Sequence, residues 1–125
     1  MLKNFSKISD DELNRIAGGV LSTTEHTISV NEANYDATVH SAPNVAILFG
    51  ASWCGPCHMM AENSERFAAK NETVVMGFLD VDENEELCRK MNVFNIPAVF
   101  YYRNGLLVDQ TVGLVPIERM EKPFF

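Results

Sequence analysis

A pentapeptide with two cysteines constrains this chain more than any other feature. Trp53-Cys54-Gly55-Pro56-Cys57 follows a continuous apolar run at 45–49 and precedes a helix-like pattern from His58 to about Lys70. The first turn of a helix offers unpaired backbone N–H groups and the positive end of the macrodipole, and both stabilise a thiolate. We therefore predict that Cys54 lies at a helix N-terminus with a lowered pKa. Cys57, one turn further, is expected close enough to close a small disulfide ring, and proline suits such a first turn.

Composition narrows the class of protein. The chain has 125 residues, of which 46% are hydrophobic, enough for one domain with a core of its own. A net charge of −7 argues against nucleic acid or an anionic membrane as a partner. No apolar run approaches the roughly 18 residues needed to span a bilayer, and no secretory signal core precedes the domain. Three cysteines do not form the even framework of a disulfide-stapled domain, so they are expected to be catalytic or metal-binding.

The first nineteen residues read as a separate segment. Apolar residues at positions 5, 8, 13 and 16 gather on one stripe of a helix, and Ser9 with Glu12 forms a capping-box pattern. Gly18-Gly19 then ends that helix. One interpretation is a short N-terminal helix packed on the domain.

The same segment resembles the double-glycine leader of bacteriocins and their pheromones. The matching positions are Ile8-Ser9, Glu12-Leu13, Ile16 and Gly18-Gly19. The resemblance implies that residues 1–19 dock on the peptidase domain of a dedicated ABC exporter and that cleavage follows Gly19. The chain would then divide into a leader, 1–19, and a domain, 20–125, which is exported to an extracytoplasmic or cell-surface location in a bacterium. The alternative is a cytoplasmic protein in which this helix is simply an addition.

After Gly19, strand and helix patterns alternate in the order β-α-β-α-β-α-β-β-α. Period-two and continuous apolar runs predict strands, and helical spacing with caps predicts helices. Asn31 is expected to cap a helix to about His40, and Asn104-Gly105 signals a hairpin. The expected strands are 26–30, 45–51, 73–81, 98–102 and 107–112; the expected helices are 31–40, 58–70, 85–91 and 116–121.

This order resembles thioredoxin over about residues 24–122. Beyond the pentapeptide, the matching landmarks are Asp80-Val81-Asp82, Asn95-Ile96-Pro97-Ala98, Asn104-Gly105 and Gly113. The resemblance implies an α/β thioredoxin fold, a central mixed sheet with helices on both faces. It also implies roles by position: Cys54 attacks, Cys57 resolves, and Trp53 covers the disulfide, with Gly55 and Pro56 supporting the pair. Pro97 would be cis and would hold the backbone of Ile96 where a substrate strand can pair.

Two positions depart from the family pattern. Leu48 stands where thioredoxins bury an aspartate that takes the proton from the resolving thiol, and Glu62 replaces a proline in the active-site helix. Without the carboxylate, Cys57 is expected to deprotonate less readily. Glu62 is expected to be a solvated helix residue.

The cysteines also fit two other kinds of site. Cys54-Gly-Pro-Cys57-His58 satisfies the bare pattern for covalent haem attachment, and zinc is conceivable with His58 and Cys88 as further ligands. The strand order and the Ile96-Pro97 loop favour the redox interpretation, so no metal or cofactor beyond the disulfide is expected. Cys88 is expected to be a small core residue, with a regulatory or dimer-forming thiol as the alternative. His58 is expected near the site without a catalytic step.

We therefore predict a monomeric thiol–disulfide oxidoreductase that acts on cysteine-containing exported peptides such as bacteriocins. It resembles the thioredoxin-like accessory proteins of bacteriocin transport. Two alternatives remain open. One is a cytoplasmic general reductant; the other is a non-catalytic accessory module that binds an exporter or peptide. The direction of electron flow also stays open, because Gly-Pro between the cysteines favours a reducing poise, whereas export and the lost aspartate favour the opposite.

Overall fold

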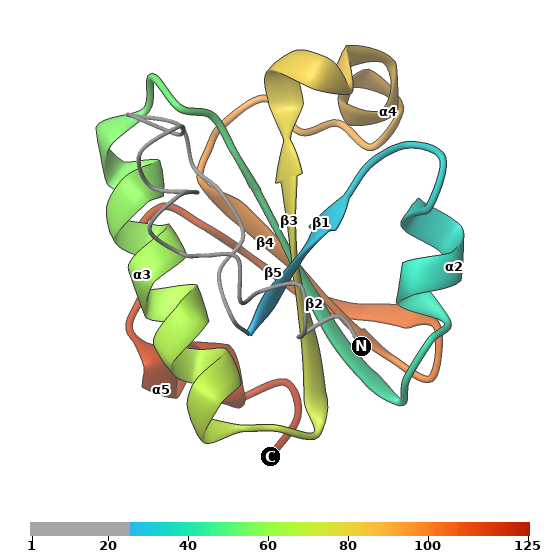
Figure 1. The fold of residues 1–125 in the computed structure, drawn as a ribbon, viewed down its shortest axis with the longest axis vertical. Coiled ribbons are helices and arrows are strands. Elements are labelled where there is room, and N and C mark those ends of the chain that lie inside the picture. Colours follow the sequence, from blue (N-terminus) through green and yellow to red (C-terminus); the bar gives the residue numbers. More distant parts are fainter. Residues whose placement is uncertain (1–25) are drawn as a thin grey trace, which may run out of the picture.

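The computed structural model describes residues 26–125 (Figure 1). The predicted leader, residues 1–19, and its expected cleavage site at Gly18-Gly19 lie outside the described residues. Within 26–125, no helix is both long and apolar enough to cross a membrane.

A five-stranded sheet forms the centre of the fold, in the order β1-β3-β2-β4-β5. The three strands β1, β2 and β3 run parallel, whereas β4 pairs antiparallel with both β2 and β5. The predicted mixed sheet is therefore confirmed. The strands are β1 Thr27–Val30, β2 Asn44–Gly50, β3 Val74–Asp80, β4 Ala98–Arg103 and β5 Leu106–Val112.

Helices cover both faces of the sheet, as the thioredoxin resemblance implies (Figure 1). Side chains alternate along β2, because successive residues of a strand point to opposite faces. Ala46 and Leu48 pack in one core cluster with α3 and α5, and Val45, Ile47 and Phe49 pack in the other with α2 and α4. The helices are α2 Tyr35–Val39, α3 Gly55–Lys70, α4 Glu85–Lys90 and α5 Ile117–Glu121, with a 3-10 turn, η2, at Val81–Glu83.

The prediction that Asn31 caps the first of these helices was wrong. Helix α2 begins at Tyr35, and its N-cap is Asn34, whose side chain makes no capping hydrogen bond. The side chains of Asn31 and Asn34 instead each accept a hydrogen bond from the other residue's backbone N–H, at 2.9 and 2.8 Å. Asparagine side chains compete with the backbone in this way, and a turn is the outcome here.

The hairpin between β4 and β5 was predicted correctly. Asn104 and Gly105 have φ of 51° and 81°, the left-handed conformation that this two-residue turn requires. Gly105 also faces the ring of His40, since a Cβ at that position would lie 2.6 Å from its nearest ring carbon.

The C-terminal residues pack at the end of α3 that lies far from the two cysteines. Phe124 is buried against Phe67 in the last turns of α3 and against Tyr101, with ring centroids 6.2 and 5.9 Å apart. Phe125, next to it, is exposed.

Candidate functional site

Cys54 and Cys57 meet where β2 ends and α3 begins. They form a disulfide with their Cα atoms 5.2 Å apart, within the usual range for such a bond. Cys54 is the N-cap of α3, with extended φ and ψ of −97° and 111°, and Gly55 and Pro56 occupy the first helical positions. The predicted arrangement of strand, cysteine pair and helix is confirmed, although α3 begins three residues earlier than the helical spacing alone indicated.

The N-terminus of α3 interacts with the sulfur of Cys54, the more exposed of the two cysteines. The backbone N–H of Cys57 donates a hydrogen bond to Sγ of Cys54, at 3.2 Å. The first turn of α3 has no acidic side chain that would oppose the positive end of its macrodipole. Cys54 retains 7% of its surface, whereas Cys57 is fully buried. A substrate sulfur can therefore approach Cys54 from the solvent. Cys57 can reach Cys54 only from the protein interior.

Three further segments surround this disulfide. Ala51 forms a small buried cluster with the two cysteines, and Val81 of η2 and Ile96 pack against it. The peptide bond between Ile96 and Pro97 is cis, as predicted. The N–H of Gly113, which follows β5 with a φ of 90°, donates to the carbonyl of Pro97 at 2.7 Å. That bond attaches the Ile96-Pro97 loop to the end of β5.

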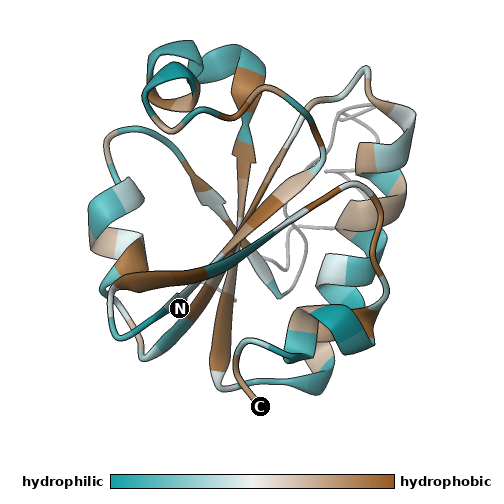
Figure 2. Ribbon diagram, turned by 180° about the vertical axis from the view of Figure 1, so that it is seen from behind, coloured by the Kyte–Doolittle hydropathy of each residue, from teal (hydrophilic) through white to brown (hydrophobic). Residues whose placement is uncertain are grey.

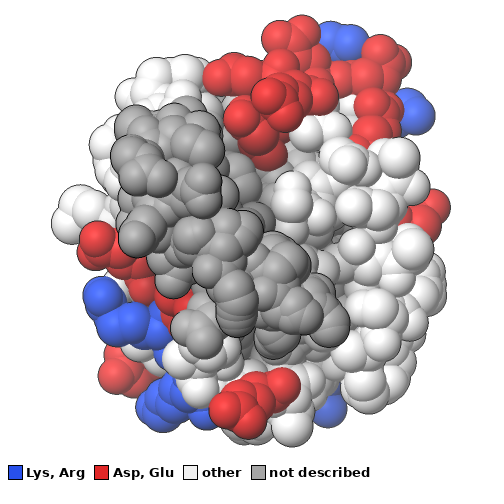
Figure 3. Space-filling model, viewed as in Figure 1, with Lys and Arg blue, Asp and Glu red and all other residues white. Residues whose placement is uncertain are grey.

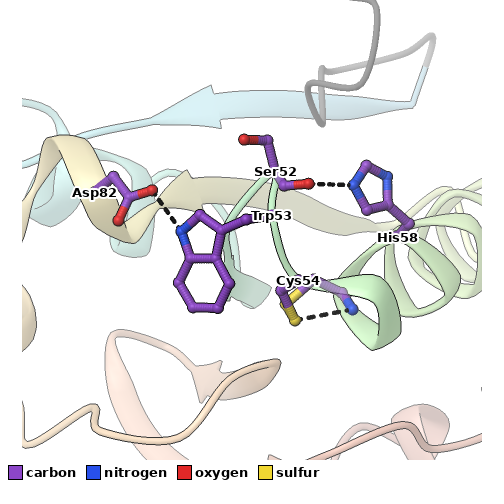
Figure 4. The surroundings of a disulfide bond; sticks show 6 residues. Ser52, Trp53, Cys54, His58 and Asp82 are labelled. Atoms are coloured by element: carbon purple, nitrogen blue, oxygen red, sulfur yellow. Dashed lines mark hydrogen bonds between the residues drawn. A yellow bond between two sulfur atoms is a disulfide. The ribbon is translucent and has the colours of Figure 1, made fainter.

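Trp53 lies beside the disulfide rather than enclosed with it. Its side chain is 68% exposed, and its indole N–H donates to Oδ2 of Asp82 at 2.8 Å (Figure 4). Asp82 was not among the residues predicted at the site. The available signal was its position just after a parallel strand that neighbours β2, because the carboxyl ends of parallel strands meet at one edge of a sheet.

His58 fixes the loop that carries Trp53. Its Nε2 lies 2.7 Å from the carbonyl oxygen of Ser52, and because a carbonyl only accepts, Nε2 must carry the hydrogen (Figure 4). This bond closes the loop from the end of β2 onto the first turn of α3. His58 thus holds the segment before Cys54 and does not itself point at the sulfurs.

The two departures from the family pattern are both visible. Leu48 is buried among apolar side chains that include Met60, Phe78 and Val99. Glu62 is exposed on α3, as predicted. Gly50, two residues further along β2 than Leu48, lies so close to Cys57 that a Cβ there would stand 3.3 Å from its Sγ.

Carboxylates gather on one side of the site. Figure 3 shows Asp and Glu side chains clustered over η2 and α4. Asp82, Glu83, Glu85 and Glu86 are all exposed there. The segments 50–57 and 92–97, which carry the disulfide and the Ile96-Pro97 loop, contain no charged residue. The potential around the disulfide is therefore negative on its η2–α4 side.

Cys88 lies apart from the pair. It is 6% exposed in the core cluster beneath α2 and α4, as predicted for a small core residue. Burial, followed by the nearby carboxylates of Asp80, Glu32 and Glu85, raises the pKa of its thiol. Among residues 26–125, no three His, Cys, Asp or Glu side chains are grouped so as to hold a metal ion.

Comparison with known proteins gives a consistent result. A family model described as thioredoxin matches residues 26–123. A thioredoxin of Alicyclobacillus acidocaldarius is 35% identical over 96 residues, which cover 76% of this chain and 91% of that protein. A thioredoxin of Staphylococcus aureus is 37% identical over 94 residues, which cover 74% of this chain and 89% of that protein.

Solved structures agree. A thioredoxin of Plasmodium falciparum superposes with a TM-score of 0.72 at 28% identity, covering 78% of this chain and 99% of that one. A mutant thioredoxin from Halobacterium salinarum also gives a TM-score of 0.72, at 25% identity, covering 81% and 89%.

Proposed function

The chain belongs to the thioredoxin family and is a thiol–disulfide oxidoreductase, and we propose that it exchanges disulfides with cysteine-containing peptides that a bacteriocin-type system exports. The observation that carries the redox chemistry is the Cys54–Cys57 disulfide at the start of α3, with Sγ of Cys54 hydrogen-bonded to the helix backbone. The observation that carries the export is the leader-like pattern of residues 1–19.

The proposed exchange runs in two displacements. In the reducing direction, the Cys54 thiolate attacks one sulfur of the substrate disulfide; that bond breaks, and the other substrate sulfur leaves and takes up a proton. The Cys57 thiol then loses its proton and attacks Sγ of Cys54. The second substrate thiol is released, and two electrons have passed from the protein to the substrate. The oxidising direction is the reverse.

The surroundings support these roles. The residual exposure of Cys54 and the full burial of Cys57 suit an attacking and a resolving sulfur. Ile96 packs against the cluster that contains the disulfide, and this position suits pairing with a substrate strand while the mixed disulfide lasts. Carboxylates beside η2 favour the approach of substrates with positive charge.

Two variants and a control test the chemistry. We expect Cys54→Ser to abolish reduction of insulin and of cysteine-containing bacteriocin peptides, and Cys57→Ser to accumulate a mixed disulfide that mass spectrometry detects. Cys88→Ala is the matched control, because it removes the third thiol without touching the pair, and it should retain activity. Unchanged activity of the Cys54→Ser variant would contradict the proposal and favour a non-catalytic accessory module.

The location of the protein tests the export. We expect mass spectrometry of the culture supernatant and cell envelope to find a form that begins at Val20. Gly19→Val should stop its formation, because in double-glycine leaders the residue at the cut has no side chain. If only the intact chain is found, and only inside the cell, a general cytoplasmic reductant becomes the better interpretation.

A further inference from the structure

A shallow pocket lies next to the Ile96-Pro97 loop. The segment that follows α4 forms one wall, and the neighbouring ends of β4 and β5 form the other. In the sheet register, Ala98 pairs with Val112 and Phe100 with Gln110, so these four side chains lie on the face that α2 and α4 share. The residues that matter for its chemistry are Phe94, Asn95, Ala98, Phe100, Gln110 and Val112.

The pocket is open and uncharged, and apolar and amide side chains share its lining. Phe94 is 73% exposed and Val112 is 59% exposed, whereas Ala98 and Phe100 form a buried floor. No charged side chain lines it, and its polar groups are amides, which include those of Asn95 and Gln110. Figure 2 shows β5 as an edge strand with hydrophobic ends and a hydrophilic middle. An apolar side chain entering here would cover Phe94 and Val112 and gain the free energy of that burial.

The pocket borders the loop that packs against the disulfide. Asn95 and Ala98 flank the Ile96-Pro97 pair, and Ile96 packs against Cys54 and Cys57. Because Cα atoms two residues apart are separated by at most about 7 Å, Phe94 is no further than that from Ile96. A substrate joined to Cys54 by a mixed disulfide must cross the same loop. In an extended substrate chain, residues two positions apart are also separated by about 7 Å, and their side chains point to the same side of the chain.

We propose that this pocket receives an aromatic or large aliphatic side chain located two residues from the reactive cysteine of the substrate. The inference rests on the proposed disulfide exchange and adds a sequence preference to it. Phe94 is then a specificity-determining residue of the known reaction, acting by apolar contact with the substrate.

Matched peptides test the preference. Each is a symmetric disulfide of a short peptide with one cysteine, and the set carries Ser on both sides, Phe two residues before the cysteine, or Phe two residues after it. The full-length protein is assayed for kcat/KM, with dithiothreitol as the recycling reductant. We expect one of the Phe peptides to be preferred over the Ser peptide by about tenfold, which corresponds to about 1.4 kcal/mol.

Two variants assign the preference to the pocket. Phe94→Ser should reduce the ratio to near one, whereas Leu106→Ser should keep it, because Leu106 is equally exposed at the other end of β5. Equal kcat/KM for all peptides in the wild type, or an unchanged ratio in Phe94→Ser, would overturn the pocket alone. Absence of turnover of every peptide would overturn the proposed function with it. A wild-type dimer that Phe94→Ser converts to monomer would assign the pocket to a second copy and overturn the proposal.

Discussion

Replacing Gly50 by alanine tests how the sheet controls the disulfide. Gly50 is the last residue of β2, and its φ lies outside the left-handed region, so alanine is compatible with the backbone. The new Cβ would stand 3.2 Å from Cε1 of Phe78 and 3.3 Å from both Cβ and Sγ of Cys57. These three separations are all shorter than ordinary contact, and both neighbours are buried. Overpacking of this kind costs about 1–2 kcal/mol, so we expect a Tm lower by roughly 5–10 °C.

The destabilisation caused by Gly50→Ala should depend on whether the Cys54–Cys57 pair is oxidised or reduced. In the disulfide, Sγ of Cys57 is held by its bond to Cys54 and cannot move away from the added methyl group. In the dithiol form, the Cys57 side chain can rotate about its Cα–Cβ bond, which relieves the sulfur contact and leaves the other two. If this relief recovers about 0.5–1 kcal/mol, the reduction potential of the pair rises by about 10–20 mV, since 30 mV is about 1.4 kcal/mol for two electrons.

Thermal unfolding of both redox forms, together with a redox titration against glutathione, measures these effects. Gly77→Ala is the matched control, because a Cβ at that position in β3 would lie 2.5 Å from Cγ2 of Val30 and 3.2 Å from Cδ1 of Ile47, and neither cysteine is among its nearest neighbours. It should lower the Tm of both redox forms equally and leave the reduction potential unchanged. A Gly50→Ala protein as stable as the wild type would refute the packing argument. Equal destabilisation of both redox forms would refute the role of the sulfur contact.

Three further predictions concern stability. Ser64→Ala should raise the unfolding free energy by about 1 kcal/mol, because the buried Ser64 hydroxyl has no hydrogen-bond partner among residues 26–125 and alanine favours a helix; denaturant titration measures this. Nη1 of Arg119 forms an ion pair with Oδ2 of Asp109 at 2.9 Å and lowers the pKa of that carboxyl, so its stabilisation is present at neutral pH and is lost as pH falls through the lowered pKa. Asp109→Asn should therefore be less stable at pH 7 by up to about 1 kcal/mol, and its Tm should converge with that of the wild type as the pH falls through the lowered pKa of Asp109; Tm values that stay apart would contradict this. Tyr35 and Tyr102 share a buried hydrogen bond of 2.8 Å, so Tyr35→Phe should cost about 1–2 kcal/mol, and the Phe/Phe double variant should cost less than the sum of the two single variants.

The elements that the sequence predicted well are those specified by local pattern. The apolar run at 45–49 and the helical spacing after His58 identified β2 and α3, and the cysteine pair between them identified the reactive centre. Asn104-Gly105 identified the hairpin because few residues adopt its conformation. The helix cap predicted at Asn31 was wrong because an asparagine side chain serves a helix cap and a turn equally well, and here Asn31 forms a turn with Asn34.

The features that the sequence missed depend on contacts between distant residues. Asp82 reaches Trp53 across 29 positions, and Gly50 lies close to Phe78 because β2 and β3 are adjacent in the sheet. The apolar periodicity of the sequence does not reveal which distant residues are neighbours, whereas the order of the strands in the sheet does. The pocket beside Phe94 was missed for the same reason, since its walls come from a loop and from β5.

The packing of Phe124 against the last turns of α3 has a practical consequence. Phe67 is twelve residues along the helix from Gly55, a rise of roughly 18 Å. Phe125 is exposed at the same end of the molecule (Figure 1). An affinity handle joined after Phe125 can therefore anchor the protein to a solid support with its sulfurs facing the solution. A Cys57→Ser protein held in this way is suited to retain thiol-linked partners from an extract and to release them with a reductant.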